Sequence, residues 1–289
     1  MASVELIAKG LRVPEGPAVL PNGQIIFTQQ IAGEVSLLAD SGVETLAYTA
    51  GAPNSVVPGG SGELYVCQNG GVVGAWLSPD RTTPGLQIIS ADGVSRIVSE
   101  ITGHQLIAPN DLAFRSDGRL SFTDPAQPYS PDARVDEGYI YSLGGGVAEE
   151  RYEVGGVYCN GVAFDGEGRL YWVESYTGRV VRLDDGAPNI LATLPEGHLP
   201  DGFTIAADGR IYIASTGSHT VDVLSPEGEF LDAIMLDDDA LPTNVCFRDS
   251  ELWVTDFGMN WVEDHSAGRL WKIETDAVGI PPHYGSLDV

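Results

Sequence analysis

One short pattern of residues recurs six times along this chain, and it limits what the chain can fold into. It is clearest from Leu106 to Asp124: a polar residue after a proline, a short apolar strand, an Asp-Gly turn, and a second strand of aromatic and β-branched residues. Asp-Gly between two such runs is a β-hairpin signal. The polar residues that open the six copies lie roughly 40 to 55 residues apart, and they are Glu15, Asn54, Asn110, Asn160, Asp201 and Asn244.

A repeat of this length with several strands in each copy is typical of radial propellers, and six copies would close a ring. The 36 glycines and 18 prolines interrupt any amphipathic helix, while apolar residues recur with a period of two. We therefore predict an all-β fold, a six-bladed β-propeller with four-stranded blades around a central channel.

The repeats begin near residues 12, 51, 107, 157, 198 and 241, with no linker or shift of composition between them. This continuity predicts a single domain over residues 1–289, with residues 276–289 as a tail. A propeller has to close its ring and protect its sheet edges. Residues 2–9 are therefore expected to pair with Gly268–Glu274 and complete the last blade.

The chain has 41 acidic and 15 basic residues, a formal charge of −26. Such a surface repels phosphate backbones and anionic membranes, so neither nucleic acid nor a membrane is an expected partner. Solubility or adaptation to salt explains the charge more simply than recruitment of cations. Three cysteines with strand-like spacing and a start without a signal-peptide pattern predict a reduced, cytoplasmic protein.

In a ring, equivalent repeat positions lie at equivalent places around the axis, so the six polar residues should converge at one end of the channel. Glu15 and Asp201 would then be two like charges among amide oxygens, and a divalent cation is the usual remedy. Oxygen-only ligands favour Ca²⁺, Mg²⁺ or Mn²⁺ over structural zinc. Any one of these residues could instead line a wet channel or a turn. Their shared register favours the metal site.

Three copies carry an insertion directly after the second strand: residues 74–85, 125–138 and 258–268. The second strand runs antiparallel to the first, so these loops should surround the polar cluster. Their aromatic and proline content predicts an ordered, partly apolar rim, although they could pack together only to shield the channel. Candidate substrate contacts are Asn54, Asn244, Tyr129, Trp261 and His104, of which His104 could equally be a surface histidine without a role.

Several motifs, taken in order, resemble the regucalcin/gluconolactonase (senescence marker protein) family. They are Glu15-Gly-Pro, Pro109-Asn-Asp with Asp117-Gly-Arg-Leu, Cys159-Asn-Gly with Gly168-Arg-Leu-Tyr-Trp, and Pro200-Asp-Gly. The resemblance covers about residues 10 to 275. It implies a six-bladed propeller with one axial divalent metal, most often Ca²⁺ with Mg²⁺, Mn²⁺ or Zn²⁺ as alternatives, and hydrolysis of sugar lactones. The metal ligands carry over onto Glu15, Asn110, Asn160 and Asp201.

The resemblance implies metal-assisted opening of a lactone, with Asp201 as both ligand and general base. No Gly-x-Ser-x-Gly nucleophile motif is present. The stretch from Gly103 to Ala108 has no arginine to hold sugar hydroxyls, and the rim is apolar. A less polar lactone or ester is therefore an alternative substrate. Non-catalytic ligand binding and protein binding remain alternative functions, because one fold hosts several chemistries.

Overall fold

The computed structural model describes residues 3–144 and 150–287. These residues form six four-stranded sheets and two small two-stranded hairpins. Their short helix is the 3₁₀ turn η1 (Gln30–Ala32), and no helix among the described residues has the length and hydropathy to cross a membrane. Six four-stranded sheets are the blades of a six-bladed β-propeller, which confirms the predicted all-β fold class.

The chain divides into two compact units. The first unit comprises residues 1–17 and 160–281, and the second comprises residues 18–159 and 282–289. One boundary falls inside β2 (Pro14–Val19), and another follows the first residue of β18 (Cys159–Phe164).

Three sheets carry the first unit. Their strand orders are β18-β19-β20-β21, β22-β23-β24-β25 and β1-β28-β27-β26. The strands are β19 (Leu170–Glu174), β20 (Arg179–Asp184), β21 (Ala187–Thr193), β22 (Pro200–Ile205), β23 (Ile211–Ser215), β24 (Thr220–Leu224), β25 (Phe230–Met235), β26 (Pro242–Arg248), β27 (Glu251–Asp256), β28 (Gly268–Glu274) and β1 (Ser3–Leu11).

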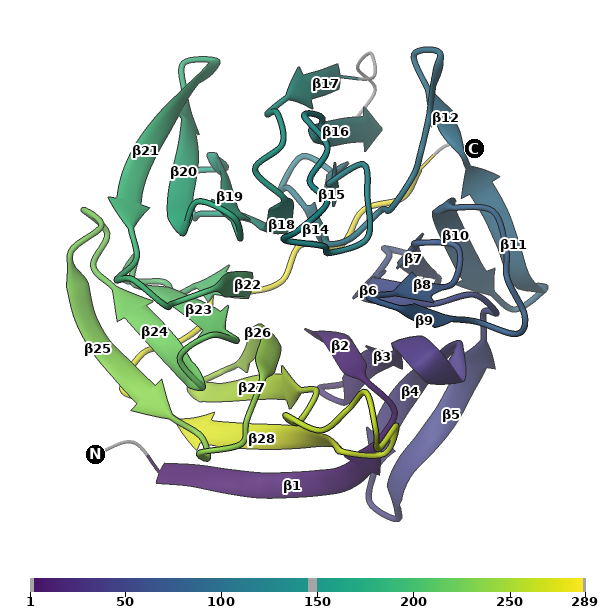
Figure 1. Ribbon diagram of the computed structural model, residues 1–289, viewed down its shortest axis with the longest axis horizontal. Helices are drawn as coiled ribbons and strands as arrows, with labels where there is room; N and C mark the ends of the chain where they lie inside the picture. The colour runs from purple at the N-terminus through teal and green to yellow at the C-terminus, as the bar shows by residue number, and fades with distance from the viewer. Residues whose placement is uncertain (1–2, 145–149, 288–289) are drawn as a thin grey trace. The chain divides into compact units, whose positions relative to one another are not determined.

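The last of these sheets joins the two ends of the chain. β1 pairs antiparallel with β28, with Leu6 opposite Trp271, and Figure 1 shows the two strands side by side. This pairing confirms the predicted closure by the N-terminal strand, except for Ala2, which lies outside the described residues.

The second unit carries the sheets β11-β10-β7-β6 and β14-β15-β16-β17 and most of β2-β3-β4-β5. The strands are β3 (Ile25–Gln29), β4 (Glu34–Ala39), β5 (Gly42–Tyr48), β6 (Pro53–Pro58), β7 (Leu64–Gln68), β10 (Gly85–Ser90), β11 (Gly93–Val98), β14 (Leu112–Phe114), β15 (Arg119–Asp124), β16 (Tyr139–Gly144) and β17 (Glu150–Glu153). The hairpins are β8 (Val72–Val73) with β9 (Trp76–Leu77), and β12 (Glu100–Ile101) with β13 (His104–Gln105).

The Asp-Gly turns form the hairpins that the repeat predicted. Gly118 and Gly209 have φ angles of 84° and 86°, a conformation that a residue without Cβ adopts at no steric cost. In the first of these turns the Gly118 N–H donates to the Arg115 carbonyl at 2.9 Å. Each turn reverses the chain between the first and second strands of its blade.

Residues 276–287 belong to the segment that the sequence analysis described as a tail, and they lie against the hairpin turns. In the first unit, the Gly279 N–H donates to the Asp249 carbonyl at 2.9 Å. In the second unit, the Leu287 N–H donates to the Tyr65 hydroxyl at 2.9 Å, and Leu287 belongs to a buried apolar cluster with Tyr65 and Phe114. These contacts add apolar burial at the turn ends of the inner strands.

Candidate functional site

Four of the six repeat-opening polar residues belong to the first unit, and the structure brings three of them close together. Asn160, Asp201 and Asn244 lie at the starts of β18, β22 and β26. A Cβ on Gly161 would lie 2.7 Å from the Asp201 carbonyl oxygen, and a Cβ on Gly202 would lie 2.0 Å from Cγ of Asn244. The glycines that follow Asn160 and Asp201 therefore permit the strand starts to approach this closely.

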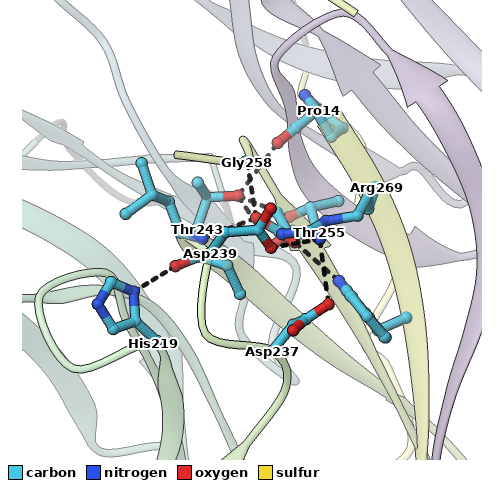
Figure 2. Close-up of polar contacts among 12 residues, drawn as sticks. Pro14, His219, Asp237, Asp239, Thr243, Thr255, Gly258 and Arg269 are labelled. Atoms are coloured by element: carbon cyan, nitrogen blue, oxygen red, sulfur yellow. Dashed lines mark hydrogen bonds and ion pairs between the residues drawn. The ribbon is translucent and has the colours of Figure 1, made fainter. Parts of the chain in front are cut away.

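Glu15, the fourth member, is tied to the same unit through the residue before it. The Thr243 hydroxyl lies 3.1 Å from the Pro14 carbonyl oxygen and 2.9 Å from the Thr255 hydroxyl. Pro14 and Thr243 directly precede Glu15 and Asn244. The hydrogen bond between them therefore holds β2 and β26 together next to these two polar residues. Figure 2 shows Thr243 and Thr255 beside Pro14.

The side chains of these four residues are largely withdrawn from solvent. Glu15, Asn160 and Asn244 are buried and Asp201 is half-buried. One Glu15 carboxylate oxygen accepts the Gly16 N–H at 2.8 Å, and Oδ1 of Asn244 accepts the Val245 N–H at 2.8 Å. These intramotif hydrogen bonds orient the two side chains relative to their own strand starts.

The other two repeat-opening residues, Asn54 and Asn110, are buried in the second unit. The Asn110 N–H donates to the Thr123 carbonyl at 2.9 Å, just before β14 begins. The Asn54 carbonyl accepts the Thr28 hydroxyl at 2.7 Å. Its side-chain Oδ1 is buried, and no other described residue gives it a hydrogen bond. An orphaned buried acceptor of this kind is usually satisfied by a water or a ligand.

Asp111 is a buried carboxylate that the sequence analysis named only within the Pro109-Asn-Asp motif. The Ser55 hydroxyl donates to its Oδ1 at 2.7 Å, and its N–H donates to the Thr123 hydroxyl at 3.1 Å. Both partners come from strand starts or ends of the second unit. The sequence signal that could have identified Asp111 is the Asn110-Asp111 pair, which places an amide and a carboxylate side chain next to each other at one strand start.

The last residue of each second strand is a further recurring feature that the sequence analysis did not single out. Asp124 accepts the Ile107, Ala108 and Ala126 N–H groups at 2.9 to 3.0 Å. It thereby ties the segment before Asn110 to the loop after β15. Burial raises the pKa of Asp124, and these three N–H groups oppose the rise. The equivalent positions hold only polar residues: Gln29, Gln68, Asp124, Glu174, Ser215 and Asp256.

Asp256 makes the same connection in the first unit. Its Oδ1 accepts the Leu241 and Gly258 N–H groups, each at 2.7 Å. Its Oδ2 accepts Nε of Arg269 at 2.7 Å and Nε1 of Trp271 at 2.8 Å. One fully buried carboxylate therefore fixes the segment before Asn244, the loop after β27 and the strand β28.

The remaining candidate residues lie on loops and a hairpin. Tyr129 follows β15 and packs edge-on against Tyr158, with ring centroids 5.1 Å apart. Trp261 follows β27 and packs against Phe257 at 5.7 Å. His104 lies exposed on β13, 5.9 Å from the Tyr139 ring. All three insertions come after the second strand of their repeat, namely β7, β15 and β27, as the sequence predicted.

The first unit's donor set fits a hard divalent cation by its chemistry. Glu15 and Asp201 supply carboxylate oxygens, and Asn160 supplies a neutral amide oxygen, the ligand types that Ca²⁺ prefers. Within residues 3–144 and 150–287, no group of three or more His, Cys, Asp or Glu side chains is arranged to hold a metal. A softer site built on thiolates or imidazoles has no counterpart in that part of the chain.

Comparison with known proteins gives a consistent result. Residues 13–276 match the model of the SMP-30/Gluconolactonase/LRE-like region. A gluconolactonase from Zymomonas mobilis is 25% identical over 278 residues, covering 84% of this chain and 75% of the relative.

Two solved structures share the fold at lower identity. A gluconolactonase from Xanthomonas campestris has a TM-score of 0.75 at 22% identity, covering 94% of this chain and 89% of its own. A regucalcin from Agrobacterium tumefaciens, described as a calcium-binding protein, has a TM-score of 0.75 at 15% identity, covering 99% of this chain and 98% of its own. With its four-stranded blades and its family match over most of its length, this chain belongs to the SMP-30/gluconolactonase/LRE-like family.

Proposed function

We propose that this protein is a metal-dependent lactonase, a carboxylic ester hydrolase that opens the ring of a lactone. The observation that carries the proposal is the close approach of Asn160, Asp201 and Asn244 at three strand starts of the first unit. Family membership and the gluconolactonase relatives support the same reaction class.

The proposed metal ligands are Glu15, Asn110, Asn160 and Asp201, with Ca²⁺ as the first candidate ion. A calcium-binding regucalcin among the similar structures supports that choice. When bound, a divalent cation polarises the lactone carbonyl and stabilises the oxyanion, a contribution of several kcal/mol. Asn54 and Asn244 are proposed to act through water, because six direct protein ligands would leave no open position for substrate.

Asp201 is the proposed general base. A carboxylate that holds an ion through one oxygen can use the other to remove a proton from the attacking water. Its half-buried position is compatible with access by both water and substrate. Glu15 and Asn160, both buried, are proposed to orient the ion rather than to transfer protons.

The substrate is proposed to be a lactone with apolar substituents. Met259 and Val262 flank Trp261 on the loop after β27, and their exposed fractions are 47% and 59%. Exposed apolar side chains on this loop suit a ligand that has an apolar body beside its polar ring. Proposed contacts are Asn54, His104, Tyr129, Asn244 and Trp261. We also propose a cytoplasmic location, with neither nucleic acid nor membranes as partners.

An indicator assay of acid release across a panel of sugar and alkyl lactones tests this function. Hydrolysis should stop in chelator and return with Ca²⁺, and alkyl lactones should be preferred. Hydrolysis that chelator leaves unchanged would contradict the metal mechanism. Stoichiometric Ca²⁺ binding without turnover of any lactone would favour the alternative, a non-catalytic, metal-stabilised propeller that binds ligands or proteins.

A further inference from the structure

Ser175 follows the last residue of β19 and connects two of the proposed ligand positions within the first unit. Its side chain is buried, with an exposed fraction of 4%. Its hydroxyl donates to the Pro200 carbonyl at 2.7 Å, and Nδ2 of Asn160 donates to the same hydroxyl at 3.1 Å. Pro200 directly precedes Asp201, so one hydroxyl bridges the Asn160 side chain and the backbone at Asp201.

The direction of these two hydrogen bonds follows from the chemistry of the groups. A serine hydroxyl has one proton, and a carbonyl oxygen can only accept. The Ser175 proton therefore goes to Pro200, which leaves lone pairs of the hydroxyl oxygen toward Asn160. Asn160 has to present its NH₂ group to Ser175, so its Oδ1, the other branch of the planar amide, points away from the Ser175 hydroxyl.

We propose that Ser175 is a positioning residue that sets the orientation of the Asn160 amide and thereby turns Oδ1 toward the ion. This inference rests on the proposed function, in which Asn160 is a metal ligand. Partners that orient metal ligands from behind commonly change metal affinity by about 10- to 100-fold when removed. Ser175 would also keep Asn160 and Asp201 at a constant spacing, since the hydroxyl contacts both strand starts.

A buried hydroxyl also bonds to the carbonyl of the proline before the other proposed carboxylate ligand. The Thr243 hydroxyl reaches the carbonyl of Pro14, the residue before Glu15, at 3.1 Å (Figure 2). Each proposed carboxylate ligand thus follows a proline whose carbonyl accepts a buried hydroxyl. Thr243 contacts the Thr255 hydroxyl rather than an amide, so among these two hydroxyls only Ser175 acts on a ligand side chain.

Calorimetric titration of the metal-stripped full-length protein with Ca²⁺ tests the proposal without an activity readout. Ser175→Ala should raise the Kd for Ca²⁺ at least about 10-fold. Ser175→Thr, which keeps the hydroxyl, should have a Kd close to that of the wild type. Ser121→Ala is the matched control, because Ser121 is also buried and its hydroxyl bonds to Ser142 at 2.5 Å within the second unit. That variant should keep the wild-type Kd even if it melts at a lower temperature.

The outcomes separate this inference from the proposed function. A wild-type protein that does not bind Ca²⁺ overturns both. Normal binding by the wild type together with an unchanged Kd for Ser175→Ala overturns the role of Ser175 alone, as does an equal loss in Ser121→Ala. If Ser175→Ala does not fold, Ser175→Cys, whose thiol is a weak hydrogen-bonding group of similar size, takes its place with the same expectation.

Discussion

The carboxylate of Asp201 has two proposed roles, metal ligand and general base, and one substitution separates them. Asp201→Asn keeps the size and one oxygen donor, so a ligand-only role predicts weaker metal binding and full activity at saturating Ca²⁺. A general-base role predicts activity that stays about 10²- to 10⁴-fold low at saturating metal. The measurement is lactone hydrolysis as a function of Ca²⁺ concentration.

Asn160→Asp is the control for Asp201→Asn. It adds a charge at a neighbouring strand start without supplying a base in the same place, so it should alter metal affinity more than the rate at saturation. Complete recovery of Asp201→Asn with added metal would remove the general-base role and leave Asp201 as a ligand.

Two cysteines should be chemically silent in the folded protein. Burial raises the pKa of the Cys67 thiol, with the nearby Asp111 and Asp124 carboxylates adding to the rise, and burial raises the pKa of Cys246 to about 12. The reactive species is the thiolate, so a thiol with that pKa is about 10⁻⁴ ionised at pH 8. Iodoacetamide at pH 8 should label these two sites only after denaturation. Cys67 is buried and Cys246 is partly exposed, so rapid labelling of Cys67 in the native protein would contradict its burial, and rapid labelling of Cys246 would contradict its raised pKa.

At the scale of elements, the buried Asp256 carboxylate connects a loop, the start of β26 and β28. Asp256→Asn would place an NH₂ group against donors and leave Arg269 without its buried partner, at a cost of about 3 kcal/mol. The expected result is a lower midpoint in urea unfolding. Asp237→Asn is the control, because Asp237 is an exposed partner of the same arginine at 3.5 Å and such surface pairs contribute little. Equal midpoints for both variants would count against the role of Asp256.

The docking of the C-terminal segment should depend on Gly285. A Cβ there would lie 2.5 Å from ring atoms of Phe114 and 2.7 Å from the Gly118 carbonyl oxygen. Gly285→Ala therefore forces the segment or the ring to move, which should cost about 1 to 3 kcal/mol. Gly166→Ala is the control, since a Cβ at Gly166 meets nothing within 4 Å. Thermal unfolding of the two variants checks the difference, and a loss of stability in Gly166→Ala alone would refute it.

Local sequence patterns predict most of the sheets, because hairpins depend on neighbouring residues. Asp117-Gly118 and the alternation after it identify β14 and β15 without any distant contact. The last blade was predictable because a ring of sheets has to close, and this requirement pairs β1 with β28. The hairpins and the pairing of β1 with β28 depend only on the spacing of the sequence repeat and on the order of the strands along the chain.

The candidate site was predictable in part. Register marks Asn160, Asp201 and Asn244 as equivalent, and the glycines after Asn160 and Asp201 are visible in the sequence. The bridging role of Ser175 was not, because it depends on the distance between a hydroxyl and a carbonyl 25 residues away in the chain. The docking of Leu287 against Tyr65 depends likewise on shape complementarity between distant segments.

At the scale of the whole molecule, charge should govern stability more than it governs the fold. The chain has 41 acidic and 15 basic residues, and arginines pair with neighbouring acids such as Asp117 and Asp184. Arg115 lowers the pKa of Asp117 to about 2. Because the pKa of Asp117 is lower in the folded protein than in the unfolded chain, where it is near 4, its ionised form stabilises the fold above about pH 4. This stabilisation is lost as the pH falls toward 2. The formal net charge of −26 exceeds what such ion pairs can neutralise, so at neutral pH the excess negative charge opposes the compact state.

Salt should therefore stabilise this protein at neutral pH. Raising NaCl from about 0.01 M to 0.15 M shortens the Debye length from about 30 Å to about 8 Å, which screens repulsion over the distances between surface carboxylates. The expected gain is on the order of 1 kcal/mol or more, or roughly 3 °C in Tm for a chain of this size. Scans in the presence of chelator exclude specific Ca²⁺ binding, and NaCl and tetramethylammonium chloride should act alike because screening depends on ionic strength. A Tm that is constant or falls over this range would mean that local ion pairs, which salt weakens, outweigh the repulsion of the excess negative charge.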